Sequence, residues 1–258
     1  MKRVDLKELV TADKLEQVVS CEQLGNIVTS SQVRGVHLHF LTQTQRQLWQ
    51  AVGHEFIEPE LLDFIDNIPS GSIFYDIGAS NGIFSHYAAA KGLEVFAFEA
   101  DAQNFSLLDH NNYLNGGRVR CFNLALSNCL GLGKLYSAKF EMAGHMKILD
   151  RPQYVGGGDF EPEYVSSVMK YPLSRWIKDF DAPQPNFLKI DVDGAEYDVL
   201  QGAAEILGKA DGVFIELSMN MPDTPAILDL LKASGFVLNL EKQVQHYVDL
   251  HNCIFLRT

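Results

Sequence analysis

From about residue 72 to the end, the sequence alternates short apolar runs with stretches of helical periodicity. Strands alternating with helices predict an α/β fold, in which a mostly parallel sheet is covered by helices on both faces. The seven predicted strands are Ile73–Ile77, Val95–Glu99, Val119–Leu124, Phe187–Val192, Val213–Leu217, Phe236–Leu240 and Cys253–Leu256.

Residues 1–70 have a different pattern, with apolar residues at helical spacing within 6–19, 42–56 and 58–68. We expect this segment to be a helical N-terminal cap that folds onto the sheet of a main domain at 71–258.

The connection between the third and fourth predicted strands, residues 127–185, is longer than a helical crossover requires. It includes His145 and the triple glycine 156–158. Long connections in compact domains are commonly lids or binding loops, but a surface insertion is an equally good interpretation.

The charge balance bears on the partners. Thirty-three acidic residues against 21 Lys and Arg give a formal net charge of −12, which disfavours nucleic acid and anionic membranes as partners. The four cysteines show no zinc-like spacing, no secretory signal is visible, and no apolar run approaches the roughly 20 residues that cross a bilayer. We expect a soluble, cytoplasmic protein; the sequence leaves its oligomeric state open.

The stretch IFYDIGASNG, residues 73–82, places an acid and two glycines where the first predicted strand passes into a helix. Ligands of parallel sheets bind beyond the carboxyl ends of the strands. Asp76, Gly78 and Gly82 all fall at that end. Gly78 allows a close backbone approach, and the helix that follows Gly82 offers free N–H groups.

The spacing discriminates between cofactors. Dinucleotide sites prefer G-x-G-x-x-G, whereas this chain has D-x-G-x-x-x-G with Ser80 at the middle position. Glu99, 23 residues after Asp76, ends the second predicted strand and is placed to accept hydrogen bonds from two ribose hydroxyls. The pattern favours a nucleoside-bearing cofactor without a pyrophosphate; an NAD-linked oxidoreductase is the alternative.

A second group of charged residues lies in FLKIDVDGAE, residues 187–196. Strand alternation puts Lys189, Asp191 and Asp193 on one side, where charges are costly unless paired or solvated at a cleft. Lys189 and Asp191 could be a structural ion pair. Asp193 and Glu196 have the spacing of a helix capping box, and we expect Asp193 to be the N-cap of the helix that follows.

Five segments together resemble the FkbM-type methyltransferases over roughly residues 55–258. They are DIGASNG, FEAD with Glu99, Ala125–Ser127, KIDVDGAE and Ile215–Leu217. The resemblance implies a class I methyltransferase (Rossmann-like) fold, with a seven-stranded sheet whose last strand is antiparallel. It also implies S-adenosyl-L-methionine as cofactor and methyl transfer, usually to a hydroxyl of a sugar, a glycan or a secondary metabolite.

The resemblance also implies residue roles. The loop around the methionine part of the cofactor would contain Asp76, Gly78, Ala79, Asn81 and Gly82. Glu99 would bind the ribose, Ala100 would lie at the adenine edge, and residues 123–126, including Ala125, would lie near the ring. Asp191 would lie beside the transferable methyl. Two departures leave the acceptor side open: Asn81 comes one residue later than usual, and Leu173–Ser174 replaces a typical Leu-Asp.

Methyl transfer to an alcohol needs a base, which typically contributes about 10²–10⁴-fold. Asp191 is the first candidate, His145 the second, and Lys189 a third charged residue of the catalytic group. No spacing of His, Asp or Glu demands a metal. N-methylation remains open, as does a third hypothesis, a methyltransferase-like domain that binds without catalysis.

Overall fold

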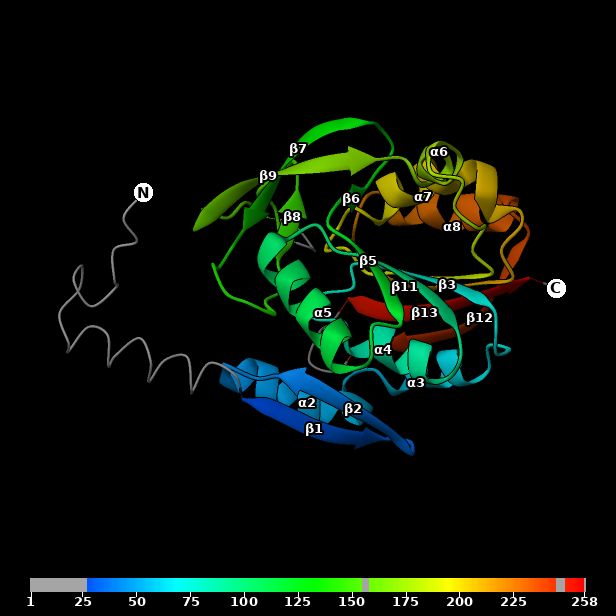
Figure 1. Cartoon of the computed structure of the whole chain (residues 1–258). Coiled ribbons are helices and arrows are strands. Elements are labelled where there is room, and N and C mark those ends of the chain that lie inside the picture. Colours follow the sequence, from blue (N-terminus) through cyan, green and yellow to red (C-terminus); the bar gives the residue numbers. More distant parts are fainter. Residues whose placement is uncertain (1–26, 155–157, 245–248, 258) are drawn as a thin grey trace, which may run out of the picture.

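The computed structural model describes residues 27–154, 158–244 and 249–257. Its main sheet has seven strands in the order β12-β13-β11-β10-β3-β4-β5 (Figure 1). The strands are β3 (Ile73–Ile77), β4 (Glu94–Phe98), β5 (Val119–Phe122), β10 (Phe187–Ile190), β11 (Gly212–Ser218), β12 (Phe236–Gln243) and β13 (Leu250–Arg257). All seven predicted strands are confirmed. The pairs from β11 through β5 are parallel, and the last strand, β13, is antiparallel to both of its neighbours, as expected.

Helices cover both faces of this sheet, because its strands bury side chains on both sides. Along β3, Phe74 packs into one core cluster and Tyr75 into the other. The Tyr75 cluster includes side chains of α6 (Leu173–Asp179), α7 (Glu196–Leu207) and α8 (Thr224–Ala233). The Phe74 cluster includes side chains of α2 (Gln45–Ile57), α3 (Pro59–Asp66), α4 (Ile83–Ala90) and α5 (Ala102–Leu114).

The N-terminal segment is not entirely helical. Helices α2 and α3 match the expected helices, but β1 (Val28–Val33) and β2 (Val36–Leu41) form an antiparallel hairpin that was not predicted (Figure 1). Its two-residue turn, Arg34 and Gly35, has positive φ at both positions, as a type I′ turn requires. Leu38 and Phe40 share the buried cluster of Phe74. The helices expected within 6–19 lie outside the described residues.

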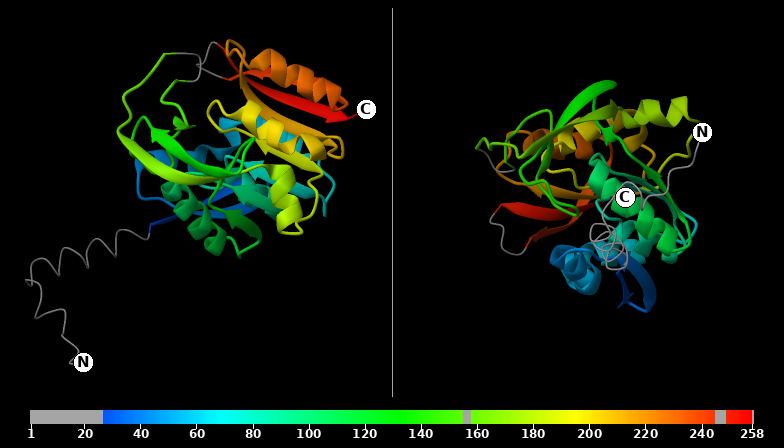
Figure 2. Two further views of the ribbon diagram at one scale, coloured as in Figure 1. Left: turned by 90° about the horizontal axis from the view of Figure 1, so that it is seen from above. Right: turned by 60° about the vertical axis from the view of Figure 1, so that its left-hand side comes forward.

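The long connection is folded rather than irregular. It contributes β7 (Gly131–Ser137), β8 (Lys147–Leu149) and β9 (Tyr164–Tyr171) to a second sheet, of order β6-β9-β7-β8, and then α6. The remaining strand, β6 (Ala125–Leu126), pairs with β9. Figure 2 shows this sheet beside the main one, so most of 127–185 is not a loop. Gly156 and Gly157 lie outside the described residues.

The strand order reverses at β3, because β4 lies on one side of it and β10 on the other. Ligand sites of open α/β sheets lie beyond the carboxyl ends of the strands at such a reversal. The carboxyl end of β3 carries the glycine loop, and the end of β10 carries Asp191. The topology therefore brings the two predicted site segments to one place.

Candidate active site

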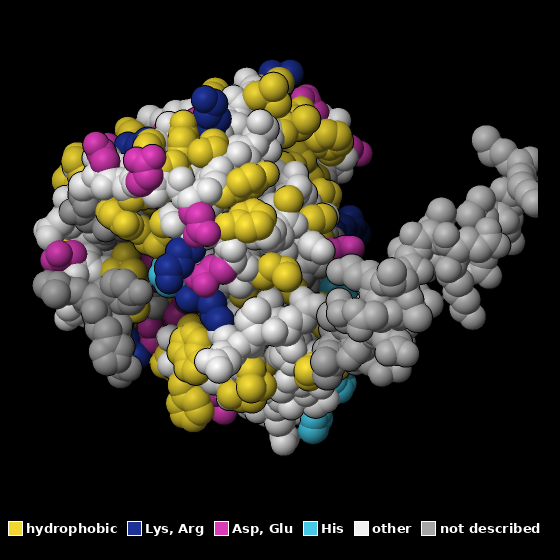
Figure 3. All heavy atoms as spheres, turned by 90° about the vertical axis from the view of Figure 1, so that its left-hand side faces the viewer, with side chains coloured by type: hydrophobic (Ala, Val, Ile, Leu, Met, Phe, Trp, Pro, Cys, Tyr) yellow, Lys and Arg dark blue, Asp and Glu magenta, His cyan; other side chains and the backbone are white. Residues whose placement is uncertain are grey.

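A cavity of about 720 Å³ opens at this edge of the sheet. Its walls come from the loops after β3, β4, β10 and β11, from α2, and from residues 143–147 of the long connection. Figure 3 shows this side of the molecule hollowed, with acidic and basic side chains gathered around the hollow. The sequence-predicted residues that line the cavity are Gly78, Ala79, Asn81, Glu99, Ala100, Ala125, His145, Lys189 and Asp191.

The two glycines of the loop have different reasons to be glycine. Gly78 has φ +82°, and a Cβ there would lie 1.8 Å from the backbone oxygen of Asp191. Only glycine permits this contact between the ends of β3 and β10. Gly82, with φ +83°, is the N-cap of α4, and its Cβ would lie 2.5 Å from Leu108 Cδ1. Gly82 lies outside the cavity lining and packs against α5.

Asp76 also lies behind the cavity wall rather than in it. Its carboxylate is buried and accepts a hydrogen bond from the Ser85 hydroxyl. Lys189 Nζ lies 3.1 Å from Asp76 Oδ1 and 3.3 Å from Asp191 Oδ2, and it donates a hydrogen bond of 2.9 Å to Gly78 O. The ion pair considered from the sequence is therefore a three-membered group that joins β3 to β10.

Lys189 is almost fully buried, at 2% exposure. Burial alone lowers the pKa of this ammonium, but the carboxylates of Asp76 and Asp191 outweigh that effect and the pKa is raised. Lys189 therefore stays protonated at neutral pH and cannot accept a proton from an acceptor. Lys189 and Asp191 both line the cavity, and the Asp191 side chain, at 29% exposure, is the most accessible member of the group.

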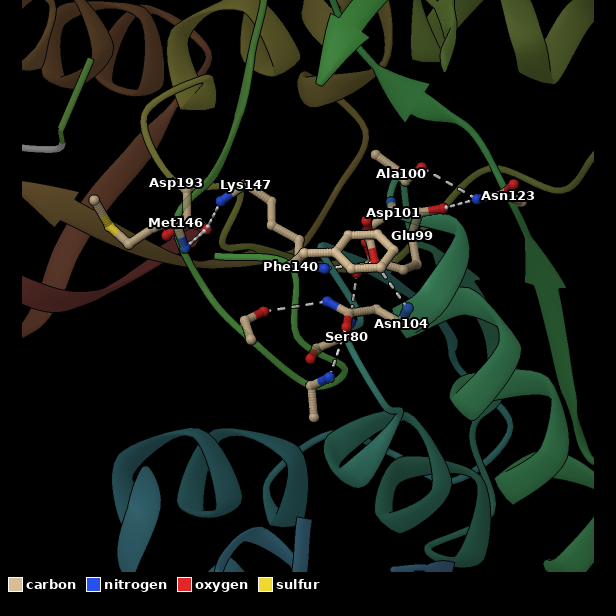
Figure 4. Close-up of polar contacts among 12 residues, drawn as sticks. Ser80, Glu99, Ala100, Asp101, Asn104, Asn123, Phe140, Met146, Lys147 and Asp193 are labelled. Carbon is tan, nitrogen blue, oxygen red and sulfur yellow. Dashed lines mark hydrogen bonds and ion pairs between the residues drawn. The ribbon is translucent and has the colours of Figure 1, made fainter. Parts of the chain in front are cut away.

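Glu99 is fixed at the end of β4 by two backbone donors (Figure 4). Ser80 N donates to Glu99 Oε2 and Asp101 N donates to Oε1, both at 2.7 Å. Burial raises the pKa of this carboxyl to about 7, although the two backbone hydrogen bonds act in the opposite direction. Each oxygen keeps a lone pair for a further donor, so Glu99 can accept two hydroxyls of a diol.

Residues 143–147, the crossing segment, form a wall of the cavity and are held from several elements. Ala143 N donates to Asn104 Oδ1 of α5 at 2.8 Å, and Arg46 Nε of α2 donates to Ala143 O at 2.6 Å. At the other end, Lys147 Nζ lies 2.7 Å from Asp101 Oδ1, and both side chains are buried. This wall therefore depends on α2, α5 and the end of β4 together.

Asp193 does not cap the helix, and this expectation was wrong. The N-cap of α7 is Ala195, while Asp193 has φ +53° and accepts hydrogen bonds from Met146 N and Lys147 N at 2.8 and 3.2 Å (Figure 4). Burial, together with the charge of Asp191, raises its pKa to about 6. Asp193 thus anchors the crossing segment to the turn after β10.

His145 reaches the cavity from the crossing segment, but its side chain remains exposed. Its ring Nδ1 is hydrogen-bonded to the guanidinium of Arg46, a cavity residue that the sequence analysis did not single out. Partial burial, followed by the charge of Arg46, lowers the pKa of His145. Because a guanidinium only donates, Nδ1 is the acceptor and the neutral ring carries its proton on Nε2, so His145 can act as a base only after this hydrogen bond breaks.

Two further acids of the cavity, Glu58 and Glu216, were not predicted as site residues. Ile190 pairs with Ile215, so Asp191 and Glu216 occupy equivalent positions at the ends of β10 and β11. Glu58 comes from the junction of α2 and α3. Burial, followed by repulsion from Asp191, raises the pKa of Glu58 to about 8 and that of Glu216 well above its ordinary value. Both carboxyls therefore hold a proton more readily than an exposed glutamate does.

Comparison with known proteins identifies the family. The model of the methyltransferase FkbM domain matches residues 76–238, more than half of the 258-residue chain. The chain belongs to the FkbM methyltransferase family. It is therefore an S-adenosylmethionine-dependent methyltransferase, and the family favours this cofactor over the nicotinamide alternative.

The relatives are distant. The hexuronic acid methyltransferase AglP of Haloferax volcanii is 21% identical over 214 residues, which cover 82% of this chain and 84% of that protein. Methyltransferase 1 of Beauveria bassiana is 27% identical over 220 residues, 73% of this chain and 83% of its own. Among solved structures, M. jannaschii TYW2 in complex with AdoMet aligns with a TM-score of 0.47 at 11% identity, covering 90% of this chain and 88% of that one.

The cavity suits the nucleoside of this cofactor. Glu99 offers its two free lone pairs to a ribose diol, and the nearby Ala100, Leu124 and Ala125 offer an apolar wall to a base. Asn123 Nδ2 holds the turn beneath them by donating to Glu99 O at 2.8 Å and Ala100 O at 3.2 Å (Figure 4). Among the described residues, no group of three or more His, Cys, Asp or Glu is arranged to hold a metal. No helix within 27–154, 158–244 or 249–257 is long and apolar enough to span a membrane.

Proposed function

We propose that this methyltransferase transfers the methyl group to a hydroxyl oxygen of a sugar, a glycan or a hydroxylated secondary metabolite. The printed name of the Haloferax relative supports a sugar acceptor. The observation that carries the proposal is the position of Asp191. Its backbone nitrogen donates to Ile77 O at 3.0 Å, its backbone oxygen lies against Gly78, and its side chain faces the cavity.

The residue roles that we propose follow from this arrangement. Gly78, Ala79 and Asn81 border the methionine part of the cofactor, with Asp76 and Gly82 as packing residues behind them. The nucleoside lies against Glu99, Ala100 and Ala125.

S-adenosylmethionine supplies an activated methyl group on a sulfonium. Asp191 orients the acceptor hydroxyl and removes its proton as the C–O bond forms and the C–S bond breaks. Lys189 positions the Asp191 carboxylate from behind. The carboxyl groups of Glu58 and Glu216 hydrogen-bond to the other hydroxyls of the acceptor.

The first experiment separates the base from the cofactor ligands. Asp191→Asn keeps the shape of the side chain but removes the base, so we expect turnover to fall by about 10²–10⁴-fold. The dissociation constant of S-adenosylhomocysteine, measured by calorimetry, should change only a few-fold. His145→Gln is the matched comparison and should reduce turnover less than tenfold.

Equal losses of turnover and cofactor affinity in Asp191→Asn would make Asp191 a cofactor ligand instead of the base. A larger loss in His145→Gln would transfer the role of base to the histidine.

The acceptor class is tested with a panel of methyl glycosides, hexuronic acids and the corresponding amino sugars, using release of S-adenosylhomocysteine as readout. Methylation of an oxygen, located by NMR, supports the proposal; methylation confined to the amines would replace it with N-methylation. Tight binding of S-adenosylhomocysteine without turnover on any acceptor would favour a domain that binds without catalysis.

We also propose a cytoplasmic location and an acceptor other than nucleic acid. Cys121, Cys129 and Cys253 are free thiols, which suits a reducing compartment. The net charge of −12 would repel a polyphosphate.

A further inference from the structure

Helix α2 is built with its polar side inward and its apolar side outward. Gln47, Gln50 and His54 are buried on the inner side. Gln50 is fixed there because its amide donates to Ala143 O at 3.3 Å and accepts from Asn81 Nδ2 at 2.9 Å. The outer side presents four large apolar side chains, the α2 apolar row: Leu48, Trp49, Val52 and Phe56, at 46, 57, 59 and 82% exposure.

The spacing makes these side chains neighbours. Leu48, Val52 and Phe56 follow one another at i, i+4 and i+8, with Trp49 beside them, so they form one stripe of roughly 12 Å along the helix. Surface helices of globular proteins normally turn such a stripe toward the core. A contiguous apolar stripe left outside marks a binding surface more often than an isolated exposed residue does.

The α2 apolar row is continuous with the catalytic cavity. Trp49 belongs to both, because it lines the cavity although more than half of the residue is exposed. Ile57, one residue beyond Phe56, and Arg46, on the turn before Trp49, also line the cavity. A molecule that enters the cavity past Trp49 would therefore continue over the outer face of α2 without a gap.

The cavity and the row differ in chemistry. The acceptor side of the cavity contains the carboxyl groups of Glu58, Asp191 and Glu216, which suit hydroxyl groups and would be desolvated at a cost by hydrocarbon. The row offers only hydrocarbon and aromatic surface. A ligand that fits both has a polar head and an apolar extension on the same molecule.

We propose that the acceptor is amphiphilic, with a hydroxylated head in the cavity and an apolar chain that lies along Leu48, Trp49, Val52 and Phe56. The inference rests on the proposed function for the identity of the head. The binding of the chain is a separate property, which can be measured without turnover.

The test compares methyl β-D-glucoside with octyl β-D-glucoside, below the micelle concentration of the latter, in the presence of S-adenosylhomocysteine. The chain has two tryptophans, and Trp176 is buried at 3% exposure, so a change of emission on titration reports mainly Trp49. Each methylene of the chain contacts the helix on one side only, so it should contribute half of the free energy of full transfer from water, which is about twofold in affinity. We expect octyl glucoside to bind at least about 30-fold more tightly than methyl glucoside and to shift the emission to the blue.

Two variants locate the chain. In the double variant Val52→Ser, Phe56→Ser, the affinity ratio between the octyl and methyl glucosides should fall to below about threefold. Leu132→Ser is the matched control: Leu132 is 81% exposed, lies on β7 and does not line the cavity, so the ratio should be unchanged.

Four results would overturn the proposal. The two glucosides could bind equally well, or the preference for octyl could survive the double variant. The double variant could also lower the melting temperature by several degrees, which would show that residues 1–26 or a second copy already cover the row. Methyl transfer to a head group with no effect of the chain would refute the amphiphilic acceptor and leave the proposed function intact. Chain-dependent binding without any methyl transfer would refute the proposed function and leave the binding of an apolar chain along α2 intact.

Discussion

Lys189 and Asp76 are register partners on the adjacent parallel strands β10 and β3, and their charged groups lie 3.1 Å apart with both side chains almost fully buried. The pair is not isolated, because the same ammonium contacts Asp191 and the carbonyl of Gly78. A single cation thus balances two carboxylates at the point where the glycine loop meets the end of β10.

Removal of that cation should be costly. Lys189→Met leaves Asp76 and Asp191 side by side without a counter-charge, and loss of one partner of a buried pair typically costs about 3–5 kcal/mol. We expect a loss of this size in the free energy of unfolding, measured by urea titration. Lys178→Met is the control: its pair with Glu205 is about 70% exposed on both sides and should contribute less than about 1 kcal/mol. Similar effects in the two variants would show that the buried group is not important for stability.

The contact between Gly78 and Asp191 gives a second prediction. Gly78→Ala should lower the free energy of unfolding by more than about 3 kcal/mol for two reasons. The new Cβ collides with the Asp191 carbonyl, and alanine is strained at the positive φ of this position. Gly71→Ala has nearly the same φ, +84°, but nothing within 4 Å of its Cβ, so it should cost only about 1–2 kcal/mol. Thermal and urea unfolding of the two variants separate the steric effect from the conformational one. If both variants lose the same amount, the close approach at Gly78 is not a constraint.

Cofactor affinity should depend on the ionisation of Glu99. The ionised carboxylate can accept the two backbone N–H groups and two ribose hydroxyls at once, whereas protonation removes one of these acceptor positions. Since its pKa is about 7, binding of S-adenosylhomocysteine should strengthen about tenfold between pH 6 and pH 8. Calorimetry at several pH values measures this. Glu99→Gln should bind more weakly and lose most of the pH dependence; a variant that keeps the full dependence would assign it to another group.

The buried histidine of α2 should make the fold sensitive to acid. His54 is 0% exposed, neither ring nitrogen has a hydrogen-bond partner within the described residues, and the ring packs against Phe84 at 5.1 Å. Burial lowers its pKa from 6.5 to about 4. Between these values the unfolded chain binds more protons than the folded one, so stability falls as the pH is lowered, by about 3 kcal/mol for this residue.

His54→Leu isolates this contribution, because all other titrating groups remain in both proteins. The variant should match or exceed the stability of the native protein at pH 7.5, and its advantage should grow as the pH falls from 6.5 to 4. An advantage that stays constant across this range would mean that His54 does not titrate on unfolding.

The main sheet could be predicted from the sequence because each of its strands is a short apolar run bounded by polar or glycine-containing segments. The hairpin was missed although VHLHFL alternates apolar and polar residues, as a half-buried strand does; its partner VTSSQV has four consecutive polar residues and shows no such alternation. Glu99 and Asp191, singled out from strand ends and spacing, both line the cavity, and their roles there stay predictions. Glu58 and Arg46 were missed because they reach the cavity from an N-terminal helix, by tertiary packing that leaves no local pattern. Asp193 was misread because its spacing to Glu196 imitates a cap, whereas its carboxylate binds the backbone of residues 146 and 147.

The cavity is assembled from residues inside and outside the region that matches the family. The residues that border the nucleoside and the glycine loop fall within the matched region 76–238, but Arg46, Trp49 and Glu58 precede it, and Asp249 and Leu250 follow it. The two sets of residues are nevertheless tied together, because Gln50 of α2 accepts a hydrogen bond from Asn81 of the glycine loop and Arg46 holds the crossing segment at Ala143. For engineering, a segment grafted from another member in place of residues 42–58 would therefore have to keep Arg46 and Gln50 if the donor site is to stay in place.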